Sequence, residues 1–592
     1  MSTPLDHLRA KMASRGVHAI LVPTADFHDS DHAGPYFACR AWLSGFTGSA
    51  GTLLILADWA GLWTDSRYYL QAEVQLSDTG ITLMKSGLPD TPTLESMLET
   101  SLKEGQTLAC DGRCVSSHRA EDLRKRLTPL GITLRCDLDL VGDVWIDRPP
   151  RSAQPLWELD CRWTGVSRAE KLAFIRADME RLGADHFLLA TLEDIAWLLN
   201  VRGNDLPHTP VFFSYLLLTT AGGTLFVTPE AVSPSIKAAL EAEGLAVDSY
   251  DSIYHSVANL PALSRVLTDR RRTSCRLLEV IPATASIIDR PSPTEKRKAV
   301  KNPVEIRNIR AAHVKDGVTL TRFLCWLKTS SAPSVATELS VTDHLESLRQ
   351  EQEGYLGPSF PPIVAYGPNG AIVHYSATEK SNQPLQAKSF LLVDTGGHYW
   401  EGTTDCTRTV ALGPLSQKEK VRYTTVLRGH LNLTAARFKA GCTGSNLDYL
   451  AKAPLWAEGL DYGHGTGHGV GYLLNVHEGP VSIHLRNTPD EPPLEAGMVI
   501  SNEPGLYLEG QYGIRLENLL LCIPQGESVY GTFLGFEPLT LVPFDLDAVD
   551  PTLLTPHETK LLNSYHQTVR ETLSPYLSPS ERVWLEQATR PI

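Results

Sequence analysis

Residues 462–472 read YGHGTGHGVGY, with a glycine at every second position. Two histidines, His464 and His468, lie four residues apart in this run, a spacing at which one face of a helix could hold a metal ion. Glycine costs roughly 1 kcal/mol per residue in a helix relative to alanine, so alternating glycines exclude a helix here. In an extended segment the glycines share one face, and the two histidines share the other with Thr466. The run therefore predicts an extended polar row whose bare face lets another backbone approach closely.

The segment FLLVDTGGHYWEGTTDCTRTVAL (390–412) is typical of a hairpin, because an apolar run and a threonine-rich run flank a glycine-rich turn. A turn centred on Tyr399–Trp400 predicts that Asp394 and Asp405 lie directly opposite each other in the antiparallel pair. Cys406 follows Asp405, so we expect its side chain on the other face of the strand, packed and unreactive.

The segment MVISNEPGLYLEGQYGIRLENLLLC (498–522) has the same construction, and a turn centred on Gly510 predicts Glu503 opposite Glu517. Each of these acids could be an ordinary solvated turn residue. Like charges in facing positions repel, however, and two such pairs beside a row of histidines call for positive charge between them. Two divalent cations would cancel the charge of four carboxylates, and oxygen-rich sites favour hard ions such as Mn²⁺. Two ions about 3.5–4 Å apart support hydrolysis.

Length, charge and hydropathy exclude several classes of function. The chain has 592 residues, 42% of them hydrophobic and 21% charged, as in soluble globular proteins of several domains. A formal net charge of −14 argues against nucleic acid as the main partner. We expect no membrane span, because no apolar run of about 18 residues occurs. The charged start, residues 1–23, does not resemble a signal peptide.

The ten cysteines are scattered, and Cys110 and Cys114 form a lone CxxxC pair without a second pair of ligands. This distribution predicts free thiols and a reducing, cytoplasmic location. Competing catalytic motifs are also missing from the sequence. It contains no GxSxG elbow and no phosphate-binding P-loop, and GTGHGVG does not open a helix as a dinucleotide fingerprint does.

The chain divides into three predicted domains. Residues 1–158 and 159–293 share a pattern of helix, strand, Trp-Leu pair and glycine-rich turns, which predicts two similar α/β domains. Residues 294–592 hold the glycine run and both acidic hairpins. The proline-rich stretch 143–160 is the predicted linker between the first two domains. The basic run EKRKAVK (295–301) is interpreted as a solvated face, given its acidic context.

The third domain resembles the pita-bread metallopeptidases, and within them the long, three-domain, cytosolic form of Xaa-Pro aminopeptidase (aminopeptidase P). The matching motifs are VHYSA, LLVDTG, GTTDCTRT, HGTGHGVG, NVHEGP, SNEPGLY and GIRLEN. Stretches of the first two domains, including SGFTGSAGT and AWLLNVRGND, extend the resemblance over essentially the whole chain. It implies a mixed α/β and α+β fold class, with two creatinase-like N-terminal α/β domains followed by a pita-bread catalytic domain.

The resemblance also implies a cofactor and its ligands. Two divalent metal ions, with Mn²⁺ the expected species, would be held by Asp394, Asp405, His468, Glu503 and Glu517. Asp394 would bind one ion and His468 with Glu503 the other, while Asp405 and Glu517 would bridge them. A hydroxide between the ions would attack the first peptide bond of a peptide with proline in second position, and Glu503 would carry the proton.

Further residues take roles only through this resemblance. His374 and His477 resemble histidines that bind substrate and steady the tetrahedral intermediate. Arg67 resembles a substrate-contacting arginine, and a homodimer is implied. His464 would support the ligands from behind. Arg515 either orients a ligand carboxylate or braces its own strand, and the sequence leaves both readings open.

Two other functions are compatible with the same motifs. A prolidase-like Xaa-Pro dipeptidase would use the same ligands, although prolidases typically have one N-terminal domain and two are predicted here. A catalytically dead protein-binding module would keep the fold but lose ligands. All five ligand positions and both auxiliary histidines are present, which argues against the binding module. The Xaa-Pro aminopeptidase is therefore the favoured function.

Overall fold

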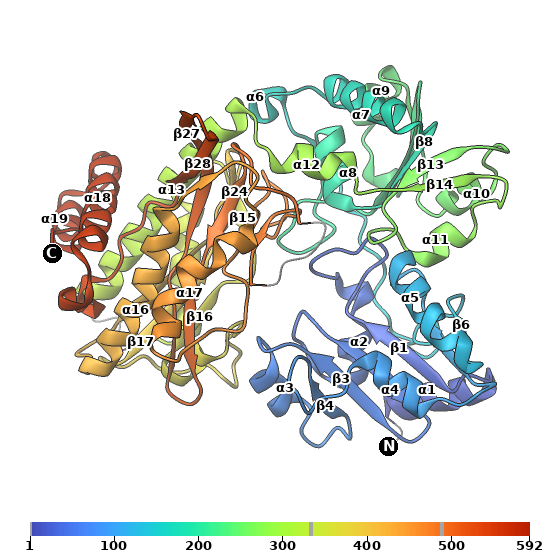
Figure 1. Ribbon diagram of the computed structural model, residues 1–592, viewed down its shortest axis with the longest axis horizontal. Coiled ribbons are helices and arrows are strands. Elements are labelled where there is room, and N and C mark those ends of the chain that lie inside the picture. The colour runs from blue at the N-terminus through green and yellow to red at the C-terminus, as the bar shows by residue number, and fades with distance from the viewer. Residues whose placement is uncertain (1–2, 331–334, 486–490) are drawn as a thin grey trace. The chain divides into compact units, whose positions relative to one another are not determined.

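The computed structural model describes residues 3–330, 335–485 and 491–592. Two units can be separated by their internal contacts (Figure 1). Unit 1 comprises Met1–Cys161 and Val166–Glu295, and unit 2 comprises Arg162–Gly165 and Lys296–Ile592. The domain boundaries at residues 158 and 293 stay predictions. Within the described ranges, each helix is too short or too polar to cross a lipid bilayer.

Unit 1 contains two six-stranded mixed sheets with the same strand order. The first runs β4 (Thr82–Lys85), β3 (Ala60–Thr64), β2 (Thr52–Leu56), β1 (Ala19–Pro23), β5 (Thr107–Cys110), β6 (Thr133–Arg135). The second runs β12 (Leu245–Ser249), β11 (Gly223–Val227), β10 (Ser214–Thr219), β8 (His186–Leu189), β13 (Arg265–Thr268), β14 (Ser286–Asp289). Strands β1 and β8 each pair antiparallel on one side and parallel on the other. The predicted duplication is therefore confirmed in topology.

Helices cover both faces of the first sheet because successive residues of a strand point to opposite sides. In β1, Ile20 packs in the cluster that includes α1 (Pro4–Ser14), whereas Leu21 packs with α4 (Leu94–Ser101) and α5 (Ser117–Leu127). Two further helices of this domain are α2 (Cys39–Ser44) and α3 (Tyr69–Gln75). The second domain has α7 (Arg168–Leu182), α8 (Leu192–Leu199), α9 (Pro234–Ala242), α10 (Ser252–Ala258) and α11 (Cys275–Glu279).

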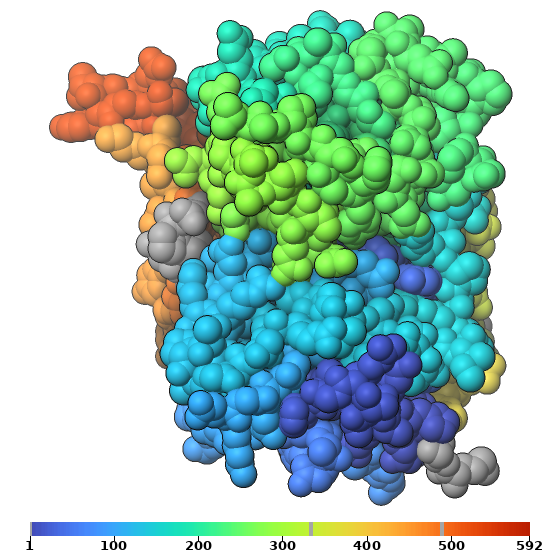
Figure 2. Space-filling view, turned by 90° about the vertical axis from the view of Figure 1, so that its right-hand side faces the viewer, coloured from blue at the N-terminus to red at the C-terminus, as the bar shows by residue number. Residues whose placement is uncertain are grey.

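The two domains of unit 1 touch each other directly. Figure 2 shows the first domain in blue to cyan against the second in green. Backbone groups join them, because the Cys275 amide donates to the Val115 carbonyl at 2.8 Å. The buried His28 ring also crosses from the first domain to the second, with Nδ1 2.7 Å from the Ala190 carbonyl oxygen. Both domains therefore behave as one packed body.

Unit 2 begins with two long helices that cover a small antiparallel sheet. Helix α13 (Pro303–Thr329) starts at an Asn302 capping box, with proline in its first turn. Helix α13 packs with α15 (Glu338–Gln350) on the apolar side of the sheet β16 (Ile363–Tyr366), β17 (Phe390–Thr395), β20 (Cys406–Ala411). Cys406 is 2% exposed inside this core, which confirms its predicted packing. A second sheet joins β15 (Tyr355–Pro358), β18 (Gly397–Tyr399) and β19 (Gly402–Thr403).

The second half of unit 2 repeats this arrangement with helices over strands. Helices α16 (Gln417–Thr434) and α17 (Asp448–Ala457) lie side by side over the orange strands in Figure 1. A four-stranded sheet has the order β21 (Arg437–Lys439), β28 (Gly531–Pro538), β27 (Asn518–Ser528), β24 (Val499–Asn502). Two-stranded ladders join β25 (Gly505–Leu508) to β26 (Tyr512–Arg515) and β22 (Gly467–His468) to β23 (Ser482–Ile483). The tail forms α18 (Pro556–Leu573) and α19 (Pro579–Ala588).

The glycine run lies extended along β24, as predicted, although only Gly467 and His468 are in a strand. A β-carbon on Gly467 would lie 1.9 Å from the Ser501 carbonyl oxygen, and one on Gly469 would lie 2.2 Å from the Glu478 carbonyl oxygen. Backbone therefore packs on backbone, which confirms the expected close approach. Within the predicted polar row, the Thr466 hydroxyl donates to Asp448 at 2.5 Å.

We expect Gly467→Ala to lower the free energy of unfolding by about 1–3 kcal/mol, because the rigid Ser501 carbonyl must move. Gly465→Ala is the matched control, since its nearest neighbour, the Ile483 carbonyl oxygen, would lie 3.4 Å away. Urea unfolding of both metal-free variants, followed by circular dichroism, measures the difference. Equal stabilities would show that the strand at Ser501 yields without cost.

Candidate metal centre

The first acidic hairpin places Asp394 and Asp405 on one face but not in directly facing positions. Strands β17 and β20 pair with Asp394 opposite Thr407 and Thr395 opposite Cys406. The predicted register is therefore wrong by two residues. The cause lies in the turn, where β18 and β19 form a separate short ladder with Tyr399 opposite Gly402. Because Asp405 and Thr407 are two residues apart, both still face the same side as Asp394.

The second acidic hairpin has the predicted register. Asn502 pairs with Asn518 between β24 and β27, and Gly505 pairs with Arg515 between β25 and β26. In both ladders the paired residues lie at equal distances in sequence from Gly510, as a turn centred on that residue requires. Glu503 and Glu517 lie between them, in facing positions.

Main-chain bonds join the two hairpins. The Glu517 amide donates to the Thr407 carbonyl at 3.1 Å, and the Arg515 amide donates to the Thr409 hydroxyl at 3.0 Å. The Thr407 hydroxyl in turn donates to the Glu517 carboxylate at 2.7 Å. Main-chain and threonine hydroxyl bonds between the strands thus hold the two hairpins, and Glu517 with them, together.

His468 turns its Nε2 atom toward the acids. Its Nδ1 lies 3.0 Å from the Gly469 carbonyl oxygen, which fixes the ring and directs Nε2 the other way. Nε2 is 3.6 Å from Asp405 Oδ2 and 3.4 Å from Glu503 Oε1. The Ser501 hydroxyl accepts from the His468 amide at 2.9 Å and donates to Glu503 Oε1 at 3.1 Å. One serine therefore positions both groups.

The acids are buried closely enough to perturb one another. Ligand atoms of Asp405, His468 and Glu517 all lie within 4.8 Å of one another. Burial, reinforced by the neighbouring carboxylates, holds the pKa of Asp405 and of Glu517 well above the usual range. Burial and the Asp394 charge raise the pKa of Glu503 to about 7, although the Arg515 charge opposes this. Without added cations the cluster therefore resists full ionisation.

The donor set fits hard divalent cations. Asp394 Oδ1 and Asp405 Oδ1 are buried and accept no hydrogen bond from any residue that the structure describes. Buried carboxylate oxygens without donors are costly unless a cation satisfies them. Oxygen and imidazole ligands suit Mn²⁺ and similar ions. The five predicted ligands supply these donor types, and ligand atoms of three of them, Asp405, His468 and Glu517, lie within 4.8 Å of one another.

Arg515 connects Asp394 to the outer histidine. Its Nη2 donates to Asp394 Oδ2 at 2.6 Å, and its Nη1 donates to the Tyr507 hydroxyl at 2.8 Å. The Tyr507 hydroxyl also lies 2.8 Å from His464 Nε2. Arg515 is 2% exposed. Of the two roles left open for Arg515, orienting a ligand carboxylate is the one that these contacts favour.

The auxiliary histidines differ in what surrounds them. The His477 ring lies 4.3 Å from the His468 ring, at 84° to it. His374 is half-buried, and the preceding Val373 carbonyl accepts from Arg515 Nη1 at 3.3 Å. Arg67 belongs to unit 1, where it donates to Asp65 at 2.7 Å. The structure thus brings His477 beside the cluster and ties the His374 segment to it through Arg515.

The residue after His477 is a buried acid that the sequence analysis missed. Glu478 is 3% exposed and forms ion pairs with Lys301 at 2.5 Å and with Lys298 at 3.6 Å. Both lysines are themselves buried, so the interpretation of the basic run 295–301 as a solvated face is wrong for them. The three charges anchor the loop of His477 to the start of unit 2. In the sequence, the one feature that could have pointed to this contact is the glutamate that directly follows the motif histidine.

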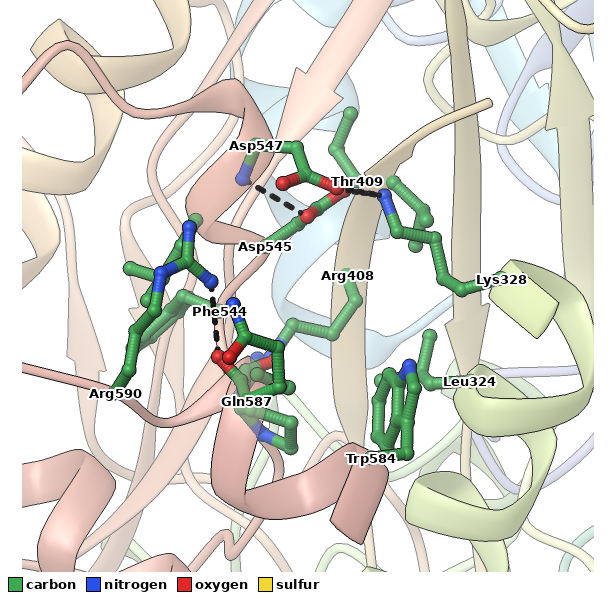
Figure 3. A pocket seen from close by; sticks show the side chains of 14 residues that line it. Leu324, Lys328, Arg408, Thr409, Phe544, Asp545, Asp547, Trp584, Gln587 and Arg590 are labelled. Carbon is green, nitrogen blue, oxygen red and sulfur yellow. Dashed lines mark hydrogen bonds and ion pairs between the residues drawn. The ribbon is translucent and has the colours of Figure 1, made fainter. Parts of the chain in front are cut away.

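A separate cavity of about 140 Å³ lies away from the acids (Figure 3). Arg408, next to Thr407 on β20, faces it from the side opposite to the cluster. Among the charged groups that line the cavity, Lys328 donates to Asp545 at 2.9 Å and also contacts Asp547. This cavity holds none of the predicted site residues.

Comparison with known proteins gives one consistent result. The pattern of the Creatinase/Prolidase N-terminal domain matches residues 4–134 and again 147–305. The pattern of metallopeptidase family M24 matches residues 307–524, and the C-terminal region of that peptidase matches 532–592. The four matches span most of the chain and agree with the duplicated topology of unit 1.

Full-length relatives carry one kind of name. A "Probable Xaa-Pro aminopeptidase P" of Paracoccidioides brasiliensis (strain Pb03) is 36% identical, over 100% of this chain and 99% of its own length. "Aminopeptidase P1" of Arabidopsis thaliana is also 36% identical, with the same coverage. A crystal structure of X-prolyl aminopeptidase from Caenorhabditis elegans, described as a cytosolic enzyme with a di-nuclear active site, covers 100% of both chains at a TM-score of 0.94 and 33% identity.

We expect the metal-free protein to lose stability as pH rises. Folded Glu503 keeps its proton up to pH about 7, whereas an unfolded glutamate loses it near pH 4.3. The folded state therefore binds more protons between these values, and the free energy of unfolding falls across this window. For Glu503 alone the loss is about 3 kcal/mol by pH 8.

Urea unfolding of chelator-treated protein between pH 5 and 8 measures this slope. The isosteric Glu503→Gln variant cannot ionise, so its stability should fall less over the same range. If both proteins showed the same slope, Glu503 would ionise normally in the folded state.

Proposed function

The chain belongs to metallopeptidase family M24, and from this premise we propose that it is a Xaa-Pro aminopeptidase. It hydrolyses the first peptide bond of peptides whose second residue is proline. The observation that carries the proposal is the buried cluster of four carboxylates around the His468 ring, with two carboxylate oxygens that lack a donor among the described residues. The names and full-length coverage of the relatives support the same activity.

Five side chains would hold two divalent ions, and we propose Mn²⁺ because oxygen ligands dominate the set. The residues are Asp394, Asp405, His468, Glu503 and Glu517. The relative described as having a di-nuclear active site supports two ions. When bound, such ions supply an activated water and polarise the scissile carbonyl.

Glu503 is the proposed proton carrier. Its carboxylate faces Glu517 across the hairpin and accepts from the Ser501 hydroxyl at 3.1 Å. That bond fixes one oxygen, so the other is available to take a proton from water and pass it to the departing nitrogen. Arg515 keeps Asp394 in place by a 2.6 Å charge-assisted bond, and Tyr507 with His464 holds Arg515 from behind.

His374 and His477 are the proposed substrate contacts. The ring of His477, beside that of His468, would donate to the oxygen on which negative charge develops, and the Glu478 ion pairs keep its loop in place. His374 would bind the peptide from the segment that Arg515 anchors. Arg67 is proposed as a further substrate contact, on the ground of its motif alone.

The bond before proline explains the need for a dedicated enzyme. It is a tertiary amide without an N–H group, so a site that recognises a backbone donor at this position cannot use it. A pocket shaped for the pyrrolidine ring selects by fit instead. We further propose a homodimer, peptide rather than nucleic acid as partner, no membrane association and a cytoplasmic location. The net charge of −14 supports a peptide rather than a nucleic-acid partner, and the relative described as cytosolic supports the location. The homodimer and the lack of membrane association rest on the family resemblance alone.

A pair of peptides tests the activity. With Mn²⁺ we expect release of the first residue from Xaa-Pro-Yaa tripeptides and loss of turnover on chelation, measured by chromatography of the free amino acid. The matching Xaa-Pro dipeptide is the control substrate, and Xaa-Ala-Yaa tests the need for proline. Cleavage of the dipeptide alone would assign a prolidase-like enzyme. No turnover of any peptide with metal bound would indicate a binding module.

Two histidine variants distinguish a metal-binding residue from a substrate-binding residue. His468→Ala should lower both metal content and rate, because it removes a proposed ligand. His477→Ala should keep its metal and lose about 10²–10³-fold in kcat, the usual cost of one oxyanion donor. Elemental analysis with steady-state kinetics measures both effects. Unchanged metal content in His468→Ala would mean that His468 is not a ligand.

A further inference from the structure

Three cysteines that the sequence scatters over 166 positions lie together in unit 1. Cys110 ends β5, Cys136 directly follows β6, and Cys275 begins α11. Cys110 Sγ lies 3.6 Å from Cys136 Sγ, and ligand atoms of Cys136, Cys275 and Glu279 all lie within 4.8 Å of one another. The three thiols are buried where the two domains of unit 1 meet, with exposures of 0%, 4% and 1% in chain order.

Gly112 makes room for this thiol cluster (Cys110, Cys136 and Cys275). A β-carbon on Gly112 would lie 2.3 Å from the Cys136 carbonyl oxygen and 2.9 Å from Cys275 Sγ. The Gly112 amide donates to that carbonyl at 3.0 Å, and the Gly112 carbonyl accepts from the Cys275 thiol at 3.3 Å. The cluster is therefore built by close backbone packing and is not an accident of flexible side chains.

Cys136 is the thiol that its surroundings favour as an anion. The Arg124 guanidinium donates to Cys136 Sγ at 3.6 Å, and the Cys110 thiol donates to the same sulfur. The Cys110 thiol that donates to it and the Arg124 charge lower the pKa of Cys136 to about 4. The titratable or charged groups around it are Cys110, Arg124, Asp137, Cys275 and Glu279. A guanidinium in direct contact favours a thiolate over a bound metal cation.

The side chain that contacts Cys136 Sγ is itself partly exposed. Arg124 pairs with Glu279, and their side chains are 38% and 32% exposed. Displacement of Arg124 would open Cys136 Sγ, which it contacts at 3.6 Å, to a molecule as small as hydrogen peroxide.

We propose that Cys136 is an oxidation site, at which a hydroperoxide generates a disulfide between Cys136 and Cys110. The partner follows from strand register. Ala109 pairs with Arg135 in the parallel ladder of β5 and β6, so Cys110 and Cys136 occupy the next facing positions. Neighbouring strands are about 4.8 Å apart, within the Cα separation of 4.4–6.8 Å that disulfides accept.

The chemistry uses one equivalent of peroxide. The Cys136 thiolate attacks one peroxide oxygen, the O–O bond breaks, and hydroxide leaves to become water with a solvent proton. Cys136 is then a sulfenic acid, oxidised by two electrons. The Cys110 sulfur attacks the Cys136 sulfur, the S–O bond breaks, and the Cys110 proton leaves with the hydroxyl as water. Two thiols and one hydrogen peroxide thus give one disulfide and two waters.

Peroxide treatment of the full chain loaded with Mn²⁺, followed by thiol blocking and non-reducing peptide mapping, tests this assignment. The expected product is a peptide pair joined through Cys110 and Cys136 and released by dithiothreitol. Exposed Cys161 is the internal reference. Between pH 7 and pH 5 an ordinary thiol in solution loses about 100-fold in thiolate, whereas the oxidation rate at Cys136 should change little.

Two arginines on α5 supply matched variants. Arg124→Gln should slow disulfide formation at pH 5 by about twofold to tenfold, since the thiolate fraction at pH 5 falls roughly twofold for a rise of one pKa unit from 4 and about tenfold for a rise of two. Arg126→Gln, which removes an arginine paired with Glu99, should leave the rate unchanged. In Cys110→Ser, a dimedone adduct at Cys136 should replace the disulfide.

Several outcomes would overturn the proposal. Cys136 that stays alkylatable after peroxide while Cys161 is oxidised would show that it is protected. A disulfide from Cys136 to Cys275 would overturn the choice of partner. Zn²⁺ retained by the thiols, with protection from peroxide, would assign a metal site instead. Because the wild-type map is read directly, the test does not depend on how well any variant folds.

Discussion

Unit 2 is organised around one electrostatic constraint, which is the need to keep four carboxylates close together and out of water. Burying ionised carboxylates costs several kcal/mol each unless cations or donors compensate. The acids lie on two hairpins whose main chains bond to each other, so Glu517 is fixed by its amide contact with the Thr407 carbonyl. Arg515 neutralises part of the charge on Asp394. The remaining demand for positive charge defines what the site binds.

Much of this arrangement follows from the alternation of side chains between the two faces of a strand, which can be predicted directly from a sequence. The centre at Gly510 fixes Glu503 opposite Glu517, because both flanking ladders keep one register. Alternating glycines exclude a helix, and the backbone packing at Gly467 uses the bare face that this implies. The duplication of the N-terminal domains could be predicted for a similar reason, since each domain repeats the same succession of helix, strands and turns.

What the sequence could not give depends on contacts between distant segments. The facing partner of Asp394 shifted to Thr407 because a separate ladder forms inside the turn, and turn chemistry alone does not reveal it. Lys298 looked solvated, since the buried Glu478 lies 180 positions away. The thiol cluster likewise assembles from three elements of two domains. Roles for Arg67, which lies in the other unit, rest on its motif.

The backbone packing beneath the glycine run has a consequence for redesign of this scaffold. Side chains can be exchanged to reshape a pocket, but carbonyl oxygens cannot. The carbonyl oxygens of Ser501 and Glu478 pack against Gly467 and Gly469, the two glycines that flank His468. The backbone position of His468 thus depends on chain packing as well as on the Ser501 hydroxyl. Selectivity can instead be probed at the segment of His374, where the Val373 carbonyl accepts from Arg515 Nη1.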